Sequence, residues 1–192
     1  MVAVHAGALA ALLSVHERAP AATEEALREH ERITRSIHER TASLPARFGS
    51  LFVDADAARR ALSERHDELA AALERVGGLV ELAVTLSWRA PRPAPALQAA
   101  SGRQYLEARA AGERDRRDAE TIVERLLDEL PCERAFTRHH ICPRDGVAAS
   151  VALLIRREEE IPVRGLVEAF GERSRDLAAS VHGPLPPYSF AS

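Results

Sequence analysis

Apolar and polar residues alternate most regularly over residues 79–88. The apolar positions of this stretch are Val80, Leu82, Val84, Leu86 and Trp88. A period of two is typical of a β-strand that buries one face. The pattern therefore predicts a strand here, and Trp88 is expected to close the core at its end.

A helical period is present in three longer segments, residues 24–41, 55–76 and 102–130. Apolar residues recur in them every three or four positions, which places these side chains on one helix face. Thr23 and Asp54 precede the first two segments, where a side-chain oxygen can accept a free N–H of the first turn. The sequence thus predicts three amphipathic helices.

The N-terminal part also contains apolar runs too short for helices. Residues 2–5 and 9–15 flank Gly7, a pattern that predicts two strands with Gly7 in the turn. Residues 44–53 combine bulky apolar side chains with one cation, Arg47. We expect a strand here, in which Arg47 pairs with a carboxylate or caps carbonyl groups and Gly49 marks a bend or a close backbone approach.

The C-terminal half is predicted to contain three more strands and one more helix. We expect a strand at 132–142, a turn at 143–146, a strand at 147–155, a helix at 156–176 that Pro162 breaks or delays, and a strand at 177–182. With the strand at 79–88 in front, the order becomes strand, helix, strand, strand, helix, strand. This order is that of the ferredoxin-like fold.

The fold class expected from these elements is α+β with two lobes. Residues 1–90 would form a small mixed α+β domain, and residues 91–192 a ferredoxin-like domain with an extended tail. Three prolines between 91 and 95 predict a semi-rigid connector and favour a boundary near position 90. The topology instead favours a boundary near Gly77, so the strand at 79–88 can belong to either lobe.

The charge of the chain limits the partners that it can be expected to bind. The formal net charge is −3 and both signs are well mixed, which is unlike the basic footprint of a nucleic-acid-binding protein. No apolar run reaches the ~18 residues that span a bilayer, and the first residues lack the basic region of a signal peptide. We expect a cytoplasmic protein that binds neither nucleic acid nor membrane.

The residues that could carry chemistry do not form a recognisable site. Cys132, His139, His140 and Cys142 are of metal-binding type, but adjacent residues of a strand point to opposite faces and the two cysteines would lie far apart. We interpret them as buried thiols and surface imidazoles. Phosphate-binding, nucleophile-elbow and zinc-protease motifs are absent from the sequence. We therefore expect no enzyme and no catalytic, cofactor or metal site.

Three segments together resemble one family. Residues 44–52 contain Pro45, Arg47, Phe48 and Gly49; the strand that ends at Trp88 is followed by a helix with Tyr105 near its start; the chain closes on Gly183-Pro184-Leu185-Pro186-Pro187-Tyr188-Ser189-Phe190. In this order and spacing they are similar to motifs of the GvpF/GvpL family of gas vesicle proteins. That family commonly has Trp where Leu185 stands, and it usually opens with one more strand before the part that matches residues 2–15.

The resemblance implies a two-lobed protein whose C-terminal part is ferredoxin-like. It also implies a role in gas vesicle formation in the cytoplasm, at the gas vesicle, without a cofactor. The implied partners are the major shell protein, which is small, very hydrophobic and prone to self-association, and other gas vesicle accessory proteins. The implied role is that of an accessory, minor structural or chaperone-like component. The structural positions carried over from the motifs are Pro45, Arg47, Phe48, Gly49, Trp88, Tyr105, Pro187, Tyr188 and Phe190.

Three alternatives stay open at this stage. The first is a haem-binding or other oxidoreductase built on paired ferredoxin-like lobes, in which His140 or His182 would be the axial ligand. The second is a general protein-interaction or regulatory module outside any gas vesicle. The third concerns the tail. Its prolines favour an extended chain, and its rings can either fold back on a lobe or serve as a docking strip for a partner.

Overall fold

The structure is a computed structural model of the chain and describes residues 1–90, 101–141 and 146–191. The chain divides into two compact units. The first is Met1–Gly78 together with Pro186–Ser192, and the second is Leu79–Leu185. The predicted proline-rich connector and most of the predicted turn at 143–146 lie outside the described residues.

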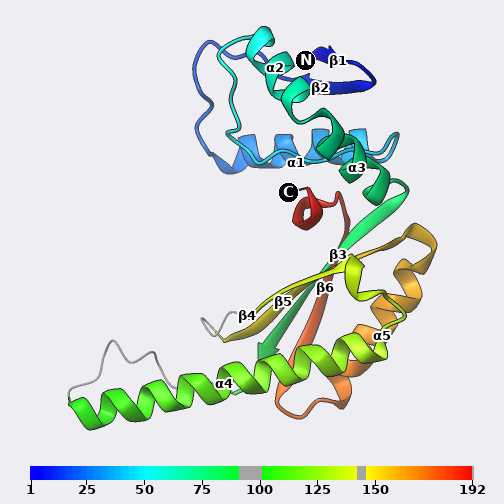
Figure 1. Cartoon of the computed structure of the whole chain (residues 1–192). Coiled ribbons are helices and arrows are strands. Elements are labelled where there is room, and N and C mark those ends of the chain that lie inside the picture. Colours follow the sequence, from blue (N-terminus) through cyan, green and yellow to red (C-terminus); the bar gives the residue numbers. More distant parts are fainter. Residues whose placement is uncertain (91–100, 142–145, 192) are drawn as a thin grey trace. The chain divides into compact units, whose positions relative to one another are not determined.

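The second unit is built on a four-stranded antiparallel sheet of order β4-β5-β3-β6 (Figure 1). Its strands are β3 (Leu79–Trp88), β4 (Thr137–Ile141), β5 (Val147–Arg156) and β6 (Leu177–Leu185). Its helices α4 (Gly102–Glu129) and α5 (Glu160–Arg173) cover one face of the sheet. The predicted strand at 79–88 is confirmed, as are the helix that follows it and the mixed α+β class.

The core of this unit follows from the period of two in β3. Val80 pairs with Ile155, Leu82 with Leu153 and Val84 with Val151, so that apolar side chains of β3 and β5 share the helix-covered face. The helices add buried residues to the same cluster: Ala119, Val123, Leu126 and Leu127 from α4 and Val163, Val167 and Phe170 from α5. Burial of this continuous apolar layer is the main stabilising term of the unit.

The first unit contains a two-stranded sheet and three helices. The strands are β1 (Val2–Ala6) and β2 (Leu9–Leu13), and the helices are α1 (Glu24–His38), α2 (Ala55–Glu64) and α3 (His66–Val76). The hairpin is confirmed, with Gly7 at φ 60° as the first of two loop residues, a conformation that glycine adopts readily. The expected N-caps are present, since Thr23 Oγ1 accepts the N–H of Ala26 and Asp54 Oδ1 that of Ala57.

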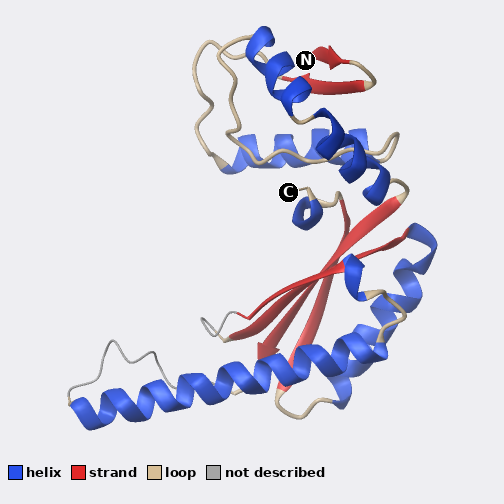
Figure 2. Cartoon of the chain, in the orientation of Figure 1, coloured by secondary structure: helices blue, strands red, loops and turns tan. Residues whose placement is uncertain are grey.

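Residues 44–53 do not form the predicted strand and are drawn as loop (Figure 2). The Ser50 N–H donates to the Arg47 carbonyl at 3.1 Å, and Gly49 has φ 83°. This turn reverses the chain where a strand would have to continue. Arg47 therefore lies in the turn, and its side chain is exposed.

Three further elements differ from their predicted bounds. The helix expected at 55–76 is two helices, because Arg65 leaves the helical dihedral angles at φ −111° and ψ 18°. The strand expected at 132–142 begins at Thr137, because residues 134–136 form a 3-10 turn. Pro162 does not break α5, since it lies in the first turn, where its missing N–H is not needed.

The compact units also differ from the expected division at position 90. β3 is hydrogen-bonded on one side to β5 and on the other to β6, so it groups with the second unit. The tail, expected to extend from the C-terminal domain, groups from Pro186 onward with the first unit. The first unit is therefore assembled from both ends of the chain.

Leu126 and Leu106 of α4 form a matched pair for testing this core. Leu126 is fully buried, whereas Leu106 is exposed. We expect Leu126→Ala to lower the free energy of unfolding by about 2–5 kcal/mol, because it leaves a cavity. Leu106→Ala should change it by at most about 0.5 kcal/mol. Denaturant unfolding followed by circular dichroism measures both; equal losses would contradict the described position of α4.

Candidate functional site

At Gly183, two residues before its end at Leu185, β6 lies very close to β3. A Cβ added at Gly183 would lie 2.8 Å from the carbonyl oxygen of Glu81 and 2.8 Å from Leu82 Cδ2. The φ of Gly183 is 136°, and the pairing of β3 with β6 shifts register beside it, between Glu81 and Ala83. A side chain does not fit here without displacing β3, so this close approach requires glycine.

Arg164 of α5 holds the same end of β6. Its guanidinium donates to the carbonyl oxygens of Val181 at 2.9 Å and of Gly183 at 3.1 Å, and it contacts Glu160 Oε1 at 3.1 Å. These bonds satisfy two backbone acceptors of an edge strand. Sequence reasoning missed Arg164; the only signal was its spacing of four residues from Glu160, which indicates a helical ion pair.

The tail beyond β6 is mostly buried within the first unit. Pro186 and Pro187 are fully buried and Phe190 is 3% exposed, whereas Tyr188 is 37% exposed. The segment Tyr188–Phe190 forms a 3-10 turn in which the Phe190 N–H donates to the Pro187 carbonyl at 3.1 Å. The burial of Phe190 is what we expect if the rings of the tail fold back on a lobe. Tyr188 keeps part of its ring accessible.

The segment 44–52 is attached to α1 through His30. Its Nε2 lies 3.0 Å from the carbonyl oxygen of Ala46, and its ring meets that of Phe48 edge-on, with centroids 5.7 Å apart. Pro45 is buried. Pro45 and Phe48 are therefore packing residues, and His30, which the sequence placed only in a helical stripe, is their partner.

The residues that follow this attachment are exposed although they are apolar. Leu51 is 58%, Phe52 47% and Val53 93% exposed. Three consecutive large apolar residues in water are unfavourable unless they have a function. We call residues 51–53 the apolar loop; they belong to the segment for which the sequence predicted a strand.

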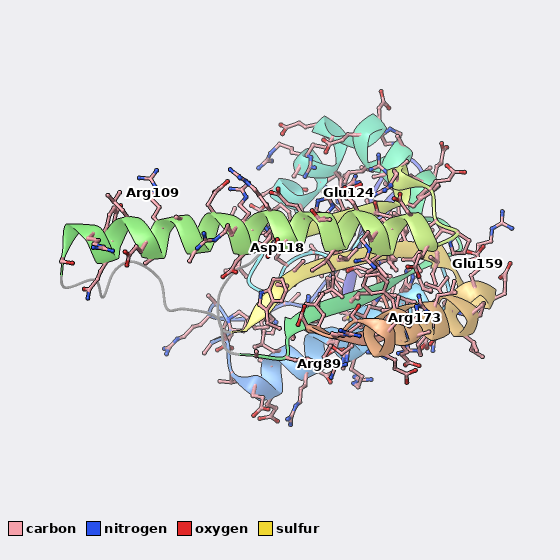
Figure 3. All side chains as sticks on the ribbon, turned by 90° about the horizontal axis from the view of Figure 1, so that it is seen from below. Arg89, Arg109, Asp118, Glu124, Glu159 and Arg173 are labelled. Carbon is pink, nitrogen blue, oxygen red and sulfur yellow. The ribbon has the colours of Figure 1, made fainter. Side chains whose placement is uncertain are left out.

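Trp88 and Tyr105 differ in their burial and in the elements that carry them. Trp88 is half-buried against the core of the second unit, and its backbone N–H donates to the Gly146 carbonyl at 2.7 Å. Tyr105 is exposed near the start of α4, and Arg109 lies on the part of this helix that extends past the sheet (Figure 3). The motif positions are thus distributed over both units and do not converge on one pocket.

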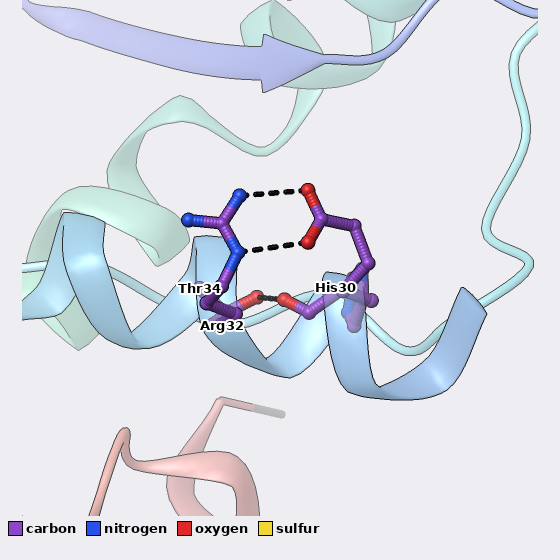
Figure 4. Close-up of polar contacts among 4 residues, drawn as sticks. His30, Arg32 and Thr34 are labelled. Carbon is purple, nitrogen blue, oxygen red and sulfur yellow. Dashed lines mark hydrogen bonds and ion pairs between the residues drawn. The ribbon is translucent and has the colours of Figure 1, made fainter. Parts of the chain in front are cut away.

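A bidentate ion pair lies on the surface of α1. Arg32 Nε and Nη2 donate to the two carboxylate oxygens of Glu29 at 2.8 and 2.7 Å, beside the bond from Thr34 Oγ1 to the His30 carbonyl (Figure 4). The hydrogen bond from Arg32 lowers the pKa of Glu29 below its usual value. Because both side chains are exposed, solvent screens the pair, and it offers no poised acid or base.

The cysteines and histidines of metal-binding type do not form a cluster in the described part of the structure. Within residues 1–90, 101–141 and 146–191, no group of three or more His, Cys, Asp and Glu side chains is placed to hold a metal ion; Cys142 lies outside these ranges. Burial, and then the charge of Glu159, raise the pKa of the Cys132 thiol above its usual value. His139 and His140 are exposed on β4.

Two further features bear on the open alternatives. His140 and His182 are exposed on β4 and β6, the two edge strands, whereas a haem ligand needs an apolar pocket. An open hollow of about 570 Å³ lies beside β4 and is lined by Glu124, Leu127, Arg134, Thr137, Arg138 and His139. Its lining is mostly charged or polar. Among the described helices, none combines the length and the apolar character needed to cross a bilayer.

Comparison of sequences gives one family over the full length. The profile of the family described as "Gas vesicle synthesis protein GvpL/GvpF" matches residues 1–192. Gas vesicle protein L of Streptomyces sp. (strain CB03234) is 30% identical in an alignment of 187 positions, and the match covers 87% of this chain and 69% of that protein. Gas vesicle protein F of the same strain is 29% identical in an alignment of 205 positions, and the match covers 96% of this chain and 84% of that protein.

Comparison of structures gives the same fold. The crystal structure of GvpF from Anabaena sp. PCC7120 matches with a TM-score of 0.71 at 17% identity, over 93% of this chain and 82% of that one. The crystal structure of GvpF from Microcystis aeruginosa matches with a TM-score of 0.72 at 17% identity, over 93% and 83% of the two chains.

Phe190 and Tyr188 allow the packing of the tail to be tested. We expect Phe190→Ala to destabilise the protein by about 3–5 kcal/mol, because a buried ring is removed. Tyr188→Ala should cost clearly less, since its ring is partly in water. Thermal unfolding of both variants measures the difference, and a larger loss for Tyr188→Ala would show that the tail packs differently.

Alanine substitutions at Gly183 and Gly146 distinguish steric crowding from backbone strain. Both have positive φ, 136° and 79°, but only Gly183 would place a Cβ against β3, since nothing lies within 4 Å of one at Gly146. Gly146→Ala should cost about 1–2 kcal/mol from strain alone. We expect Gly183→Ala to cost more, as measured by urea unfolding. Equal costs would mean that β6 is not held against β3 at this point.

Proposed function

The chain belongs to the GvpL/GvpF family of gas vesicle synthesis proteins, and we propose that it is a non-enzymatic accessory protein that binds the major gas vesicle shell protein during assembly. Family membership supports the role in gas vesicle formation. The binding of the shell protein, the chaperone-like action, and a place in the cytoplasm at the growing vesicle with other gas vesicle proteins are parts of the proposal.

The apolar loop is the observation that carries this proposal. Leu51, Phe52 and Val53 present aliphatic and aromatic surface to water directly after the segment attached to His30. That attachment fixes the start of the loop, which lowers the entropy lost when a partner binds it. A very hydrophobic partner that must be kept from self-association needs such a surface, because apolar contact is non-directional and needs no charge pairing.

We also propose that the second unit is a ferredoxin-like lobe. The strand order β6-β3-β5-β4, all antiparallel, supports it, as do crossover helices after the first and third strands of the unit. In this arrangement the helix-covered face is occupied by the core. The first unit, with its exposed apolar residues, is then the better candidate for contact with the shell protein.

Co-expression with the shell protein tests the function. We expect the full chain to copurify with it, and the double variant Phe52→Asp/Val53→Asp to recover about tenfold less, because two charges would have to be desolvated on binding. Ile161→Asp is the matched control: Ile161 is also apolar and exposed, but it lies in α5, outside the apolar loop. It should bind like the unaltered chain.

Two outcomes would contradict the proposal. If the unaltered chain does not copurify with the shell protein, the proposed partner is wrong. If Ile161→Asp loses as much binding as the loop variant, the apolar loop is not the contact. Thermal unfolding of each variant shows whether a loss reflects folding instead.

A further inference from the structure

The backbone of the apolar loop is as open as its side chains. Among the residues that the structure describes, no hydrogen bond reaches an N–H or C=O group of Leu51, Phe52 or Val53. Leu51 and Phe52 lie outside every helix, strand and turn. Backbone N–H and C=O groups always require a hydrogen-bonding partner, so those of the loop depend on water in the free protein.

Both ends of the apolar loop are anchored. Before it, the Ser50 N–H donates to the Arg47 carbonyl at 3.1 Å. After it, Asp54 Oδ1 accepts the N–H of Ala57 at 2.7 Å and thereby caps α2. The open segment is therefore short, and it has little conformational freedom left to lose when a partner binds it.

The open backbone distinguishes between two kinds of partner surface. A helix laid over the loop would bury its apolar side chains, but the backbone groups of a helix are already bonded to one another. The N–H and C=O groups of the loop would then lose water without gaining a partner, which costs free energy. A strand edge, in contrast, pairs with these groups and contacts the apolar side chains at the same time.

The partner has to supply the sheet for such a pairing. The loop is only three residues long, and two paired strands alone are marginal in water. The loop would therefore add to a sheet that the partner already has, at a strand whose outer edge is unpaired. An edge of this kind is also a surface through which copies of a protein associate with one another.

We infer that the apolar loop adds as a short terminal strand to an unpaired, apolar strand edge of the shell protein. This inference rests on the proposed function and names the backbone chemistry of the same surface. Backbone hydrogen bonds supply part of the affinity, and the three apolar side chains supply the rest. Occupation of the edge prevents another copy of the shell protein from pairing there.

One side of the loop is better suited to pairing than the other. A strand directs the backbone groups of alternate residues to the same side, so Leu51 and Val53 share one side and Ser50 and Phe52 the other. The Ser50 N–H already donates to the Arg47 carbonyl. The groups of Leu51 and Val53 are therefore the ones that pair. A further strand finds the opposite side engaged at Ser50, so the loop ends the sheet.

Proline and alanine substitutions in the full chain test the pairing. Leu51→Pro and Leu51→Ala both remove the isobutyl group, but only proline removes the N–H. Phe52→Pro and Phe52→Ala are the matched controls for the opposite side. We expect Leu51→Pro to copurify about tenfold less shell protein than Leu51→Ala, because an acceptor of the edge loses its donor. Phe52→Pro should copurify as much as Phe52→Ala.

The outcomes separate this inference from the proposed function. If the unaltered chain does not bind the shell protein, both are wrong. If it binds, and Leu51→Pro binds as well as Leu51→Ala or Phe52→Pro loses as much as Leu51→Pro, the inference is wrong and the function stands. If Leu51→Pro instead abolishes a self-association seen by analytical ultracentrifugation and leaves shell binding intact, the occupant is a second copy, which also overturns the inference.

Amide hydrogen exchange decides the case in which Leu51→Pro has a lower unfolding midpoint than Leu51→Ala. It is measured by NMR on the unaltered chain, alone and in the complex with the shell protein. The amides of Leu51 and Val53 should exchange about tenfold more slowly in the complex, because each then donates a hydrogen bond. Unchanged exchange at both amides in a stable complex would overturn the inference.

Discussion

The close approach of β6 to β3 at Gly183 is the contact on which the path of the chain depends. β3 is the strand between β5 and β6, and its helix-covered face supplies Val80, Leu82, Val84 and Leu86 to the core. Gly183 allows β6 to approach the backbone of Glu81, and Arg164 holds the same end of β6 through two carbonyls. The chain leaves the sheet after Leu185, and Pro186, Pro187 and Phe190 then contribute to the first unit.

The parts of the fold that the sequence predicted are those set by local period and capping. β3, the α4 helix and the β1–β2 hairpin have clear periods or a glycine turn, and Thr23 and Asp54 are N-caps in the structure as expected. Residues 44–53 were predicted as a strand because they are apolar, yet a turn at Gly49 and an attachment to His30 determine their path. Apolar composition alone does not distinguish a buried strand from an exposed loop.

The candidate surfaces could be predicted only in part, and for a similar reason. The motif residues of the tail came from the family resemblance, and which of their rings is buried depends on tertiary packing. Arg164 was missed because its partners are carbonyl groups, which every residue has. The exposure of Leu51, Phe52 and Val53 also depends on tertiary packing, and a sequence pattern indicates buried positions only where apolar residues recur in a regular order.

The two units expose different surfaces to solvent. The edge strands β4 and β6 of the second unit carry the hydrogen bonds of Arg138 and Arg164, whereas the first unit exposes three consecutive apolar residues, Leu51, Phe52 and Val53. Amide hydrogen exchange of the full chain, alone and copurified with the shell protein, tests the central claim that the first unit binds it. The account predicts slower exchange around Phe52 in the copurified protein. Protection confined to residues 79–185 would contradict it.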